Sequence, residues 1–167
     1  MDAQTPAKTF QDVVDLKGIK PSLQIYVSIG GASLDLRTPT AVTDNGTAAQ
    51  PVFGNIARTA ANRQKFARAL LKFMNQYGFD GADLDWEYPG APDRRGKPDD
   101  TKNYVELFKT LREAFDKSGR RLGLTFTAPS SYWYLKWFDL PGLMKYADRL
   151  NLMSYDLHGV WDGDNPM

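Results

Sequence analysis

The chain has 167 residues, of which 42% are hydrophobic and 25% charged, and its formal net charge is +1 at pH 7. This composition is typical of one globular domain and excludes a disordered or fibrous chain. Because acidic and basic residues are nearly equal in number and scattered, we expect neither nucleic acid nor a membrane surface as a partner. The absence of cysteine excludes disulfides, thiolate metal sites and catalysis by a thiol.

Two further features bear on the location of the chain. No apolar run is long enough to span a bilayer, and residues 1–6 lack the basic and apolar regions of a secretory signal. These observations do not assign a cellular compartment.

The first part of the chain predicts a strand, a loop and a helix. Residues 23–29 form an apolar, β-branched run that predicts a buried strand, which stops at Gly30 and Gly31. Residues 32–55 are rich in Thr, Asp, Gly and Pro and predict a long loop. Thr59 can then cap an amphipathic helix, which we expect to end at Gly78.

An unusually acidic segment follows at residues 79–89 and contains four carboxylates. Three of them, Asp83, Asp85 and Glu87, occupy alternate positions, so in a β-strand they would project from one face. The apolar residues between them would point to the other face. Like charges held this close raise the pKa of at least one carboxyl group, and a retained proton is what a general acid needs.

The acidic segment could instead supply oxygen ligands to a metal ion. A calcium loop of the EF-hand type needs a glycine at its sixth position. Counting from Asp80 or Asp83, the sixth position is Asp85 or Tyr88, so neither start fits. We therefore expect no metal and no cofactor, and we expect a strand rather than a calcium loop.

The remaining segments continue the alternation of helices and strands. A second amphipathic helix carries its apolar residues between Tyr104 and Phe115. Residues 122–129 predict a third strand, residues 141–147 a short helix, and residues 149–155 a fourth strand. This order is typical of a parallel α/β sheet with right-handed crossovers, in which ligands bind at the carboxyl ends of the strands.

With these residues in view, the chain resembles the family-18 glycoside hydrolases, the chitinases, and is most similar to fungal members of the killer-toxin-like group. The resemblance covers residues 23–162. Its central signature is Asp-x-x-Asp-x-Asp-x-Glu. The matching positions are Asp80, Asp83, Asp85 and Glu87, with shorter matches at Ser28-x-Gly30-Gly31 and Met153-x-Tyr155-Asp156.

The resemblance implies a retaining, substrate-assisted hydrolysis of β-1,4-linked N-acetylglucosamine. It implies that Glu87 is the acid and later the base, and that Asp85 orients the acetamido group of the substrate. Asp83 would share a proton with Asp85, and Tyr155 would donate to the acetamido oxygen. The substrate-binding positions implied or suggested are Ser28, Tyr88, Ala128, Trp133, Met153 and Asp156.

Trp133 has a second interpretation. Its ring could stack on the apolar face of a sugar, or it could pack beneath its own loop. Asp80 also has two interpretations, because a carboxylate at this position could belong to the functional site or could fix the start of the strand.

A closed barrel of eight β/α units takes about 250 residues, whereas this chain shows four strands that resemble strands three to six. We therefore expect a partial (β/α)8 TIM barrel, in which residues 1–167 form a partial catalytic domain with part of the substrate groove. The expected ligand is chitin or its oligomers, with weak or no activity of the chain alone. We expect an extracellular location for the intact enzyme, and self-association through the two open sheet edges.

Two other functions are compatible with this scaffold. One is a chitin-binding lectin without catalytic activity, although such relatives typically lack the final acid, which is present here as Glu87. The other is an endo-N-acetylglucosaminidase that cuts the core of N-linked glycans and shares the acidic signature.

Overall fold

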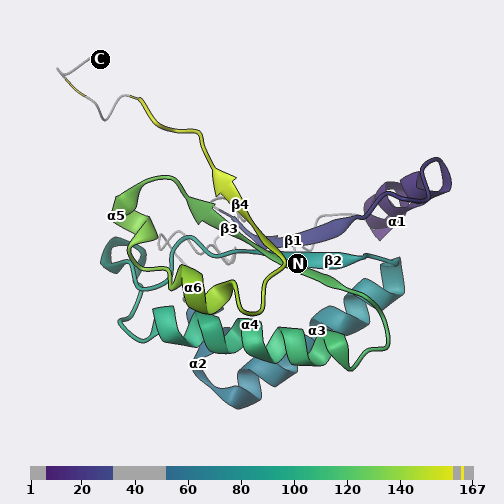
Figure 1. Ribbon diagram of the computed structural model, residues 1–167, viewed down its shortest axis with the longest axis horizontal. Helices are drawn as coiled ribbons and strands as arrows, with labels where there is room; N and C mark the ends of the chain where they lie inside the picture. Colours follow the sequence, from purple (N-terminus) through teal and green to yellow (C-terminus); the bar gives the residue numbers. More distant parts are fainter. Residues whose placement is uncertain (1–6, 32–51, 160–162, 164–167) are drawn as a thin grey trace.

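The computed structural model of the chain describes residues 7–31, 52–159 and 163, and its strands form one parallel sheet (Figure 1). The strands are β1 (Tyr26–Gly30), β2 (Gly81–Asp85), β3 (Gly123–Pro129) and β4 (Arg149–Met153). They lie in the sheet in chain order, each paired in parallel with the strand before it. This is the order of successive β/α units in a barrel, so the predicted fold of four such units is confirmed.

Most of the helices lie on one side of this sheet. They are α1 (Ala7–Asp15), α2 (Val52–Arg58), α3 (Ala60–Tyr77), α4 (Asp100–Asp116), α5 (Tyr132–Leu135) and α6 (Leu140–Leu143), with short 3-10 turns at η1 (Leu16–Gly18) and η2 (Pro92–Arg94). In Figure 1, α2, α3, α4 and α6 lie below the sheet, and α5 lies beyond the carboxyl end of β3. None of the described helices is long and apolar enough to cross a membrane.

The ends of α3 follow directly from the sequence. The side chain of Thr59 accepts a hydrogen bond of 3.2 Å from the backbone N–H of Asn62, which satisfies one of the free donors of the first turn. Gly78 ends the helix with a φ of 83°, a left-handed conformation that costs glycine little. Both predicted ends of this helix are confirmed.

The predicted loop 32–55 is wrong at its end, because α2 begins at Val52. Residues 32–51 lie outside the described part of the chain. The helix forms because Phe53 is buried and stacks on Trp86, with ring centroids 5.6 Å apart. This packing outweighs the local preference for a loop, which composition alone suggested.

Other elements are shorter than predicted or differ in type. β1 begins at Tyr26 rather than at residue 23, and β4 ends at Met153 rather than at residue 155. The short helix covers only four residues, Leu140–Leu143. The aromatic segment after β3, predicted as a loop, begins with the single helical turn α5 because Ser131 caps it by accepting a hydrogen bond from the Trp133 N–H.

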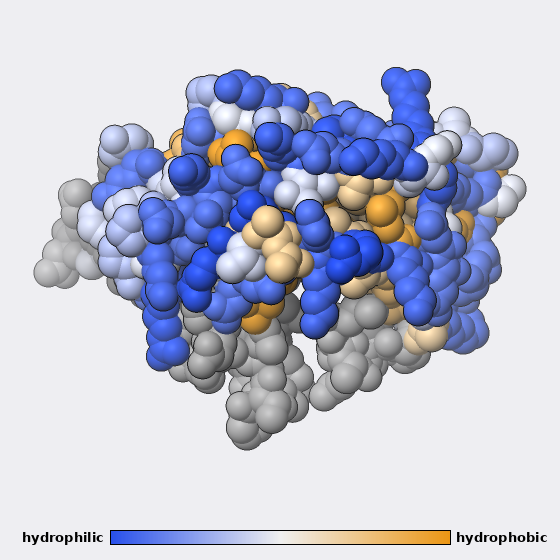
Figure 2. All heavy atoms as spheres, turned by 90° about the horizontal axis from the view of Figure 1, so that it is seen from below, coloured by the Kyte–Doolittle hydropathy of each residue, from blue (hydrophilic) through white to orange (hydrophobic). Residues whose placement is uncertain are grey.

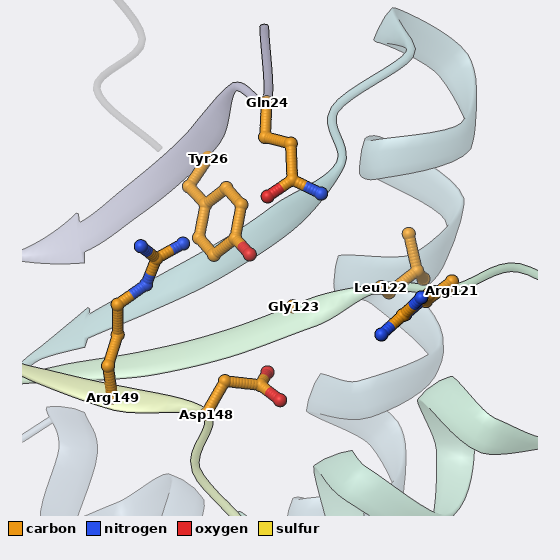
Figure 3. A pocket seen from close by; sticks show the side chains of 7 residues that line it. All are labelled: Gln24, Tyr26, Arg121, Leu122, Gly123, Asp148 and Arg149. Carbon is orange, nitrogen blue, oxygen red and sulfur yellow. The ribbon is translucent and has the colours of Figure 1, made fainter. Parts of the chain in front are cut away.

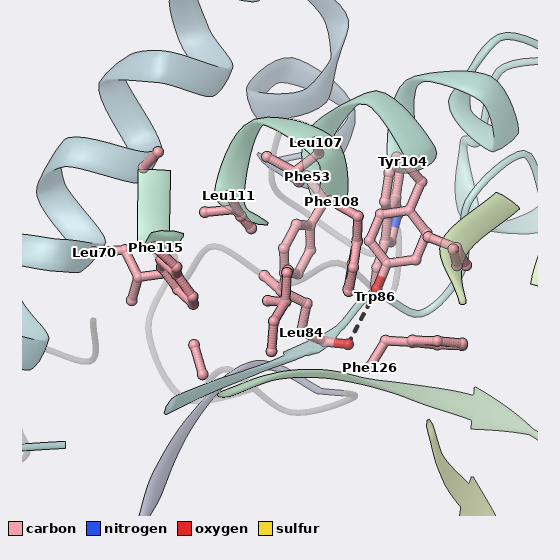
Figure 4. Packing of buried hydrophobic residues seen from close by; sticks show 14 of the residues in the cluster. Phe53, Leu70, Leu84, Trp86, Tyr104, Leu107, Phe108, Leu111, Phe115 and Phe126 are labelled. Atoms are coloured by element: carbon pink, nitrogen blue, oxygen red, sulfur yellow. Dashed lines mark hydrogen bonds between the residues drawn. The ribbon is translucent and has the colours of Figure 1, made fainter. Parts of the chain in front are cut away.

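The hydrophobic core lies between the sheet and α4 (Figure 4). Leu84 and Phe126 point from β2 and β3 toward the helical layer, and both side chains are fully buried. The predicted apolar stripe of α4 is confirmed, since all of its members are buried: Tyr104, Leu107, Phe108, Leu111 and Phe115. The Tyr104 hydroxyl donates a hydrogen bond of 3.1 Å to the carbonyl of Leu84, which ties α4 to the acidic strand.

The outer surface of the helical layer is mostly hydrophilic (Figure 2). The helices therefore shield the core from solvent, and the opposite face of the sheet carries the polar residues described next.

Candidate active site

The face of the sheet opposite the helices carries the acidic residues of β2. Asp83 pairs in register with Ser28, and Asp85 pairs with Gly30, so these residues share one face. Leu84, between the two acids, is buried against the helices instead. The alternation of the sequence thus places Asp83 and Asp85 side by side on the polar face.

Asp83 is the centre of a hydrogen-bond network on this face, although its side chain is only 7% exposed. One of its oxygens accepts from the Thr125 hydroxyl at 2.6 Å and from the Asn151 amide at 2.9 Å. The other accepts from Ser28 at 3.0 Å and from Thr127 at 2.9 Å. The donors come from β1, β3 and β4, so Asp83 connects all the strands of the sheet.

Asn151 reaches Asp83 across the intervening strand. Neighbouring strands lie about 4.8 Å apart, so β4 and β2 would be about 10 Å apart in a flat sheet. The direct contact between the two side chains therefore indicates that the sheet curves toward its polar face, as it does in a barrel.

We expect Thr125→Val to lower the free energy of unfolding by about 1–2 kcal/mol, because a buried donor to Asp83 is lost while the volume is kept. Thr110→Val is the matched control, since the hydroxyl of Thr110 only bonds to Glu106 of its own helix. Urea unfolding curves of both variants measure the difference. Equal losses in the two variants would contradict a special role of the network.

Gly30 and Gly31, at the end of β1, lie directly against Asp85. The backbone N–H of Gly31 donates a hydrogen bond of 2.9 Å to the carbonyl of Asp85. A Cβ atom on Gly30 would lie 2.0 Å from that same carbonyl oxygen, and one on Gly31 would lie 3.3 Å from the Asp85 carboxylate. Both glycines also have positive φ angles, of 117° and 96°. Two glycines are therefore required for the chain to pass this close to the acid.

Glu87 follows the strand rather than belonging to it, because β2 ends at Asp85. Between them, Trp86 is buried on the helical side, with its ring 5.6 Å from Phe53 and 5.1 Å from Tyr104. This packing fixes the backbone at the end of the strand, and the side chain of Glu87 is 8% exposed. The acid is therefore held on an anchored segment rather than on a free loop.

Two phenols lie within electrostatic range of Asp85 and Glu87. Burial raises the pKa of Tyr155, and the negative charges of Asp85 and Glu87 raise it further. Burial and then the charge of Glu87 raise the pKa of Tyr88 well above its usual range, although Arg94 opposes this. Tyr155 is 61% exposed and Tyr88 is half-buried. Two neutral hydroxyl donors thus stand beside the acids.

The raised pKa of Tyr88 predicts a loss of stability at high pH. The folded state holds this proton more tightly than the unfolded state, whose tyrosine pKa is about 10. The free energy of unfolding should therefore fall as the pH rises above about 10, by at most about 1.4 kcal/mol per pH unit for one proton. We expect Tyr88→Phe to reduce this slope and Tyr132→Phe, at an exposed tyrosine, to leave it unchanged. Urea unfolding at several pH values measures how the free energy of unfolding changes with pH. If this dependence in Tyr88→Phe equals that of the wild type, the prediction is refuted.

The other predicted substrate-binding residues lie in different environments. Met153 is buried at the end of β4, and Asp156 is exposed, with a φ of 52°. Ala128 is 1% exposed and packs in the core, so its side chain does not reach the polar face. Trp133 is 62% exposed on α5, and the Lys136 ammonium lies 4.4 Å from its ring centroid.

Asp80, the first acid of the signature, lies at the amino end of β2. It accepts a hydrogen bond of 2.9 Å from the Ile25 N–H and forms an ion pair of 2.6 Å with Lys17. These contacts favour the structural interpretation, in which Asp80 fixes the start of the strand.

The partners of Asp83 on β3 and β4 were not predicted from the sequence. Thr125 and Thr127 alternate along a predicted strand, a period that could have placed them on the polar face. Asn151 has no such signal, because its contact depends on the curvature of the sheet.

A hollow of about 460 Å³ lies at the amino ends of the strands, at the opposite end of the sheet from Asp85 and Glu87 (Figure 3). The ring of Tyr26 lies over Gly123 there, and the Arg149 guanidinium lies 5.6 Å from the centroid of that ring. None of the predicted site residues lines this hollow.

Comparisons with known proteins agree on one family. The sequence model of the glycosyl hydrolases family 18 matches residues 1–166. The chain is 44% identical over 115 residues to the killer toxin subunits alpha/beta of Kluyveromyces lactis, which is 66% of this chain and 10% of that protein. It is 32% identical over 155 residues to the endochitinase of Manduca sexta, which is 92% of this chain and 26% of that protein.

A solved structure shares the fold. Catalytic domain 2 of the group II chitinase of Ostrinia furnacalis, determined as a mutant in complex with penta-N-acetylchitooctaose, is 28% identical with a TM-score of 0.77. The similarity covers 93% of this chain and 37% of that one. The chain thus spans well under half the length of the relatives that it matches.

Proposed function

The chain belongs to the glycosyl hydrolases family 18, and from this membership we propose that it carries the acidic centre of a chitinase that hydrolyses β-1,4-linked N-acetylglucosamine. The main support is the arrangement at the carboxyl end of β2. Asp83 and Asp85 share the polar face, and the charges of Asp85 and Glu87 both act on Tyr155. Residues 1–167 are, in this proposal, part of a catalytic domain.

In the proposed reaction Glu87 donates its proton to the glycosidic oxygen as the bond to the anomeric carbon breaks. The acetamido oxygen of the substrate attacks that carbon, because retaining enzymes of this type use the substrate as the nucleophile. The resulting ring is cationic, and the negative charge of Asp85 stabilises it. Glu87 then takes a proton from water, which opens the ring and returns the acid to its starting state.

Tyr155 and Asp83 support Asp85 in this proposal. The Tyr155 phenol is protonated near neutral pH, and its raised pKa extends this range upward, so it can donate to the acetamido oxygen. Four hydrogen bonds hold the carboxyl group of Asp83 in place, and all four donors are uncharged hydroxyl or amide groups. Asp83 therefore offers Asp85 a fixed partner for a shared proton.

Substrate contacts are proposed for the residues around the acids. Ser28 binds Asp83 directly, so its contribution would pass through that carboxyl group. Trp133 is exposed beside the carboxyl ends of the strands and presents a ring to a sugar, with Lys136 over the same ring. Ala128 would contribute through its backbone, since its side chain is in the core.

Incubation with chitin oligomers tests the proposal directly. Because the chain is part of a catalytic domain, we expect only slow release of shorter oligomers. The products should keep the configuration of the anomeric carbon, which NMR of the fresh products detects. Glycoproteins with N-linked glycans form the second arm of the assay. Cleavage in that arm alone would overturn the chitinase assignment, and binding of oligomers without any cleavage would favour a lectin.

A further inference from the structure

The residues around Tyr88 form a cluster that the proposed reaction does not yet use. The ring of Tyr88 stacks on that of Tyr134, with centroids 4.1 Å apart and an interplanar angle of 21°. The guanidinium of Arg94 lies 5.9 Å from the Tyr88 ring centroid and 5.5 Å from that of Tyr134. The guanidinium thus lies beside the stacked pair, within about 6 Å of both ring centroids, where the attraction between a cation and an aromatic ring is stabilising.

Polar contacts lock this cluster together. The Tyr134 hydroxyl donates a hydrogen bond of 2.7 Å to the Asp93 carboxylate and accepts one of 3.4 Å from Arg94. Arg94 and Asp93 also form an ion pair of 3.5 Å. The orientation of the Tyr134 side chain is therefore fixed by the stacking of its ring and by the hydrogen bonds of its hydroxyl. We call Tyr134, Arg94 and Asp93 the Tyr88 clamp.

The clamp joins two separate segments at the site. Arg94 and Asp93 belong to η2, which follows the acidic strand, whereas Tyr134 belongs to α5, which follows β3. Tyr88 lies between them and directly follows Glu87 in the chain. Tilting the Tyr88 ring out of its plane would break the stack, so the clamp opposes such a movement of the residue next to the acid.

Tyr88 is itself coupled to the acids, since the charges of Glu87 and Asp85 act on its hydroxyl. The groups that surround this corner are the carboxyl groups of Asp85 and Asp93, the phenols of Tyr134 and Tyr155, and the cation Arg94.

We propose that Arg94 and Tyr134 are positioning residues, which hold the Tyr88 ring and thereby the side chain of Glu87 in the geometry needed for proton transfer. The inference rests on the proposed function of Glu87 as the acid. Neither residue needs to touch the substrate for this role. Displacement of a catalytic group by about 1 Å can slow a reaction by about two orders of magnitude, so a loosened clamp should act on the chemical step rather than on binding.

The kinetic test uses Arg94→Met and Tyr134→Ala, with Arg95→Met as the matched control. Arg95 is the adjacent residue, and its side chain is exposed. In hydrolysis of a chromogenic chitin trimer, we expect kcat to fall about tenfold in both clamp variants while KM changes less than about twofold. Tyr134→Phe keeps the stack and should lose less than Tyr134→Ala. Unchanged kcat in both clamp variants of an active chain overturns the proposal.

A second readout does not depend on activity. The chain has only three glutamates, Glu87, Glu106 and Glu113, so labelling their carboxyl carbons with ¹³C gives three NMR signals, and Glu87→Gln assigns one of them. We expect the Glu87 signal and its titration to change in Arg94→Met and Tyr134→Ala and to stay fixed in Arg95→Met. The other two signals report whether the fold is intact.

The two readouts separate the possible failures. If the Glu87 signal is the same in the wild type and in both clamp variants, the positioning role is refuted whatever the activity. If the wild type hydrolyses no chitin oligomer, the proposed function fails for this chain on its own, and the carboxyl signal still decides whether the clamp positions Glu87.

Discussion

Glu87→Gln is expected to lower the rate of chitin oligomer hydrolysis by about two to four orders of magnitude, the usual contribution of a general acid. The amide keeps the size of the side chain but has no proton to give to the leaving oxygen. Since Glu87 is 8% exposed and follows the anchored Trp86, the substitution should leave its surroundings in place. Binding of oligomers should therefore persist while kcat falls.

Glu106→Gln is the control for this experiment. Glu106 lies on α4, with its side chain 42% exposed and only a long ion pair of 3.9 Å to Arg63. Its replacement should leave hydrolysis unchanged. Product release measured by chromatography gives the rates, and calorimetric titration with an oligomer gives the affinities. Hydrolysis that survives in Glu87→Gln at the wild-type rate would show that another group is the acid.

The second large effect is expected for Gly30→Ala, which should destabilise the fold by about 3–5 kcal/mol and abolish hydrolysis. The new methyl group would lie 2.0 Å from the Asp85 carbonyl oxygen, so the backbone of β1 or of β2 must move. The φ of 117° adds strain for any residue with a Cβ. Both effects act at the residue that orients the substrate in the proposed reaction.

Gly119→Ala separates steric contact from backbone strain. Gly119 also has a positive φ, of 73°, but a Cβ atom there would meet nothing within 4 Å. Its replacement should cost about 1 kcal/mol and leave hydrolysis unchanged. Thermal or urea unfolding measures both costs. If Gly30→Ala cost no more than Gly119→Ala, the close approach of Gly30 to Asp85 would not be essential.

Local patterns in the sequence predicted most of the fold. The cap at Thr59, the end of the helix at Gly78 and the buried stripe of α4 depend on residues within a few positions of one another. α1 was not predicted, although Phe10, Val13 and Val14 have helical spacing. The ring of Phe10 packs 5.2 Å from both Phe73 and Tyr77. The signal for α1 was therefore present but short, and its stability comes from tertiary contacts.

The part of the candidate site that depends on the alternation of side chains along a β-strand was predictable from the sequence. Alternation placed Asp83 and Asp85 on one face, and the strand order placed Tyr155 near them. The network of Asp83 and the contacts of Tyr134 in the Tyr88 clamp were not predicted, because they join side chains 40 to 68 positions apart through the curvature of the sheet and the path of two loops. Asn151 to Asp83 spans 68 positions, and the contact between Asp83 and Thr125 spans 42. The Tyr134 hydroxyl reaches Asp93 over 41 positions.

The spatial order of the strands matters for biosynthesis. Because β1, β2, β3 and β4 are neighbours in the same sequence in which a ribosome makes them, each new strand finds its docking edge already synthesised. A nascent polypeptide can therefore add one β/α unit at a time, and no early strand has to wait for the last one. Stepwise assembly of this kind during translation would leave the growing edge, in turn β1, β2 and β3, as the surface that chaperones must shield.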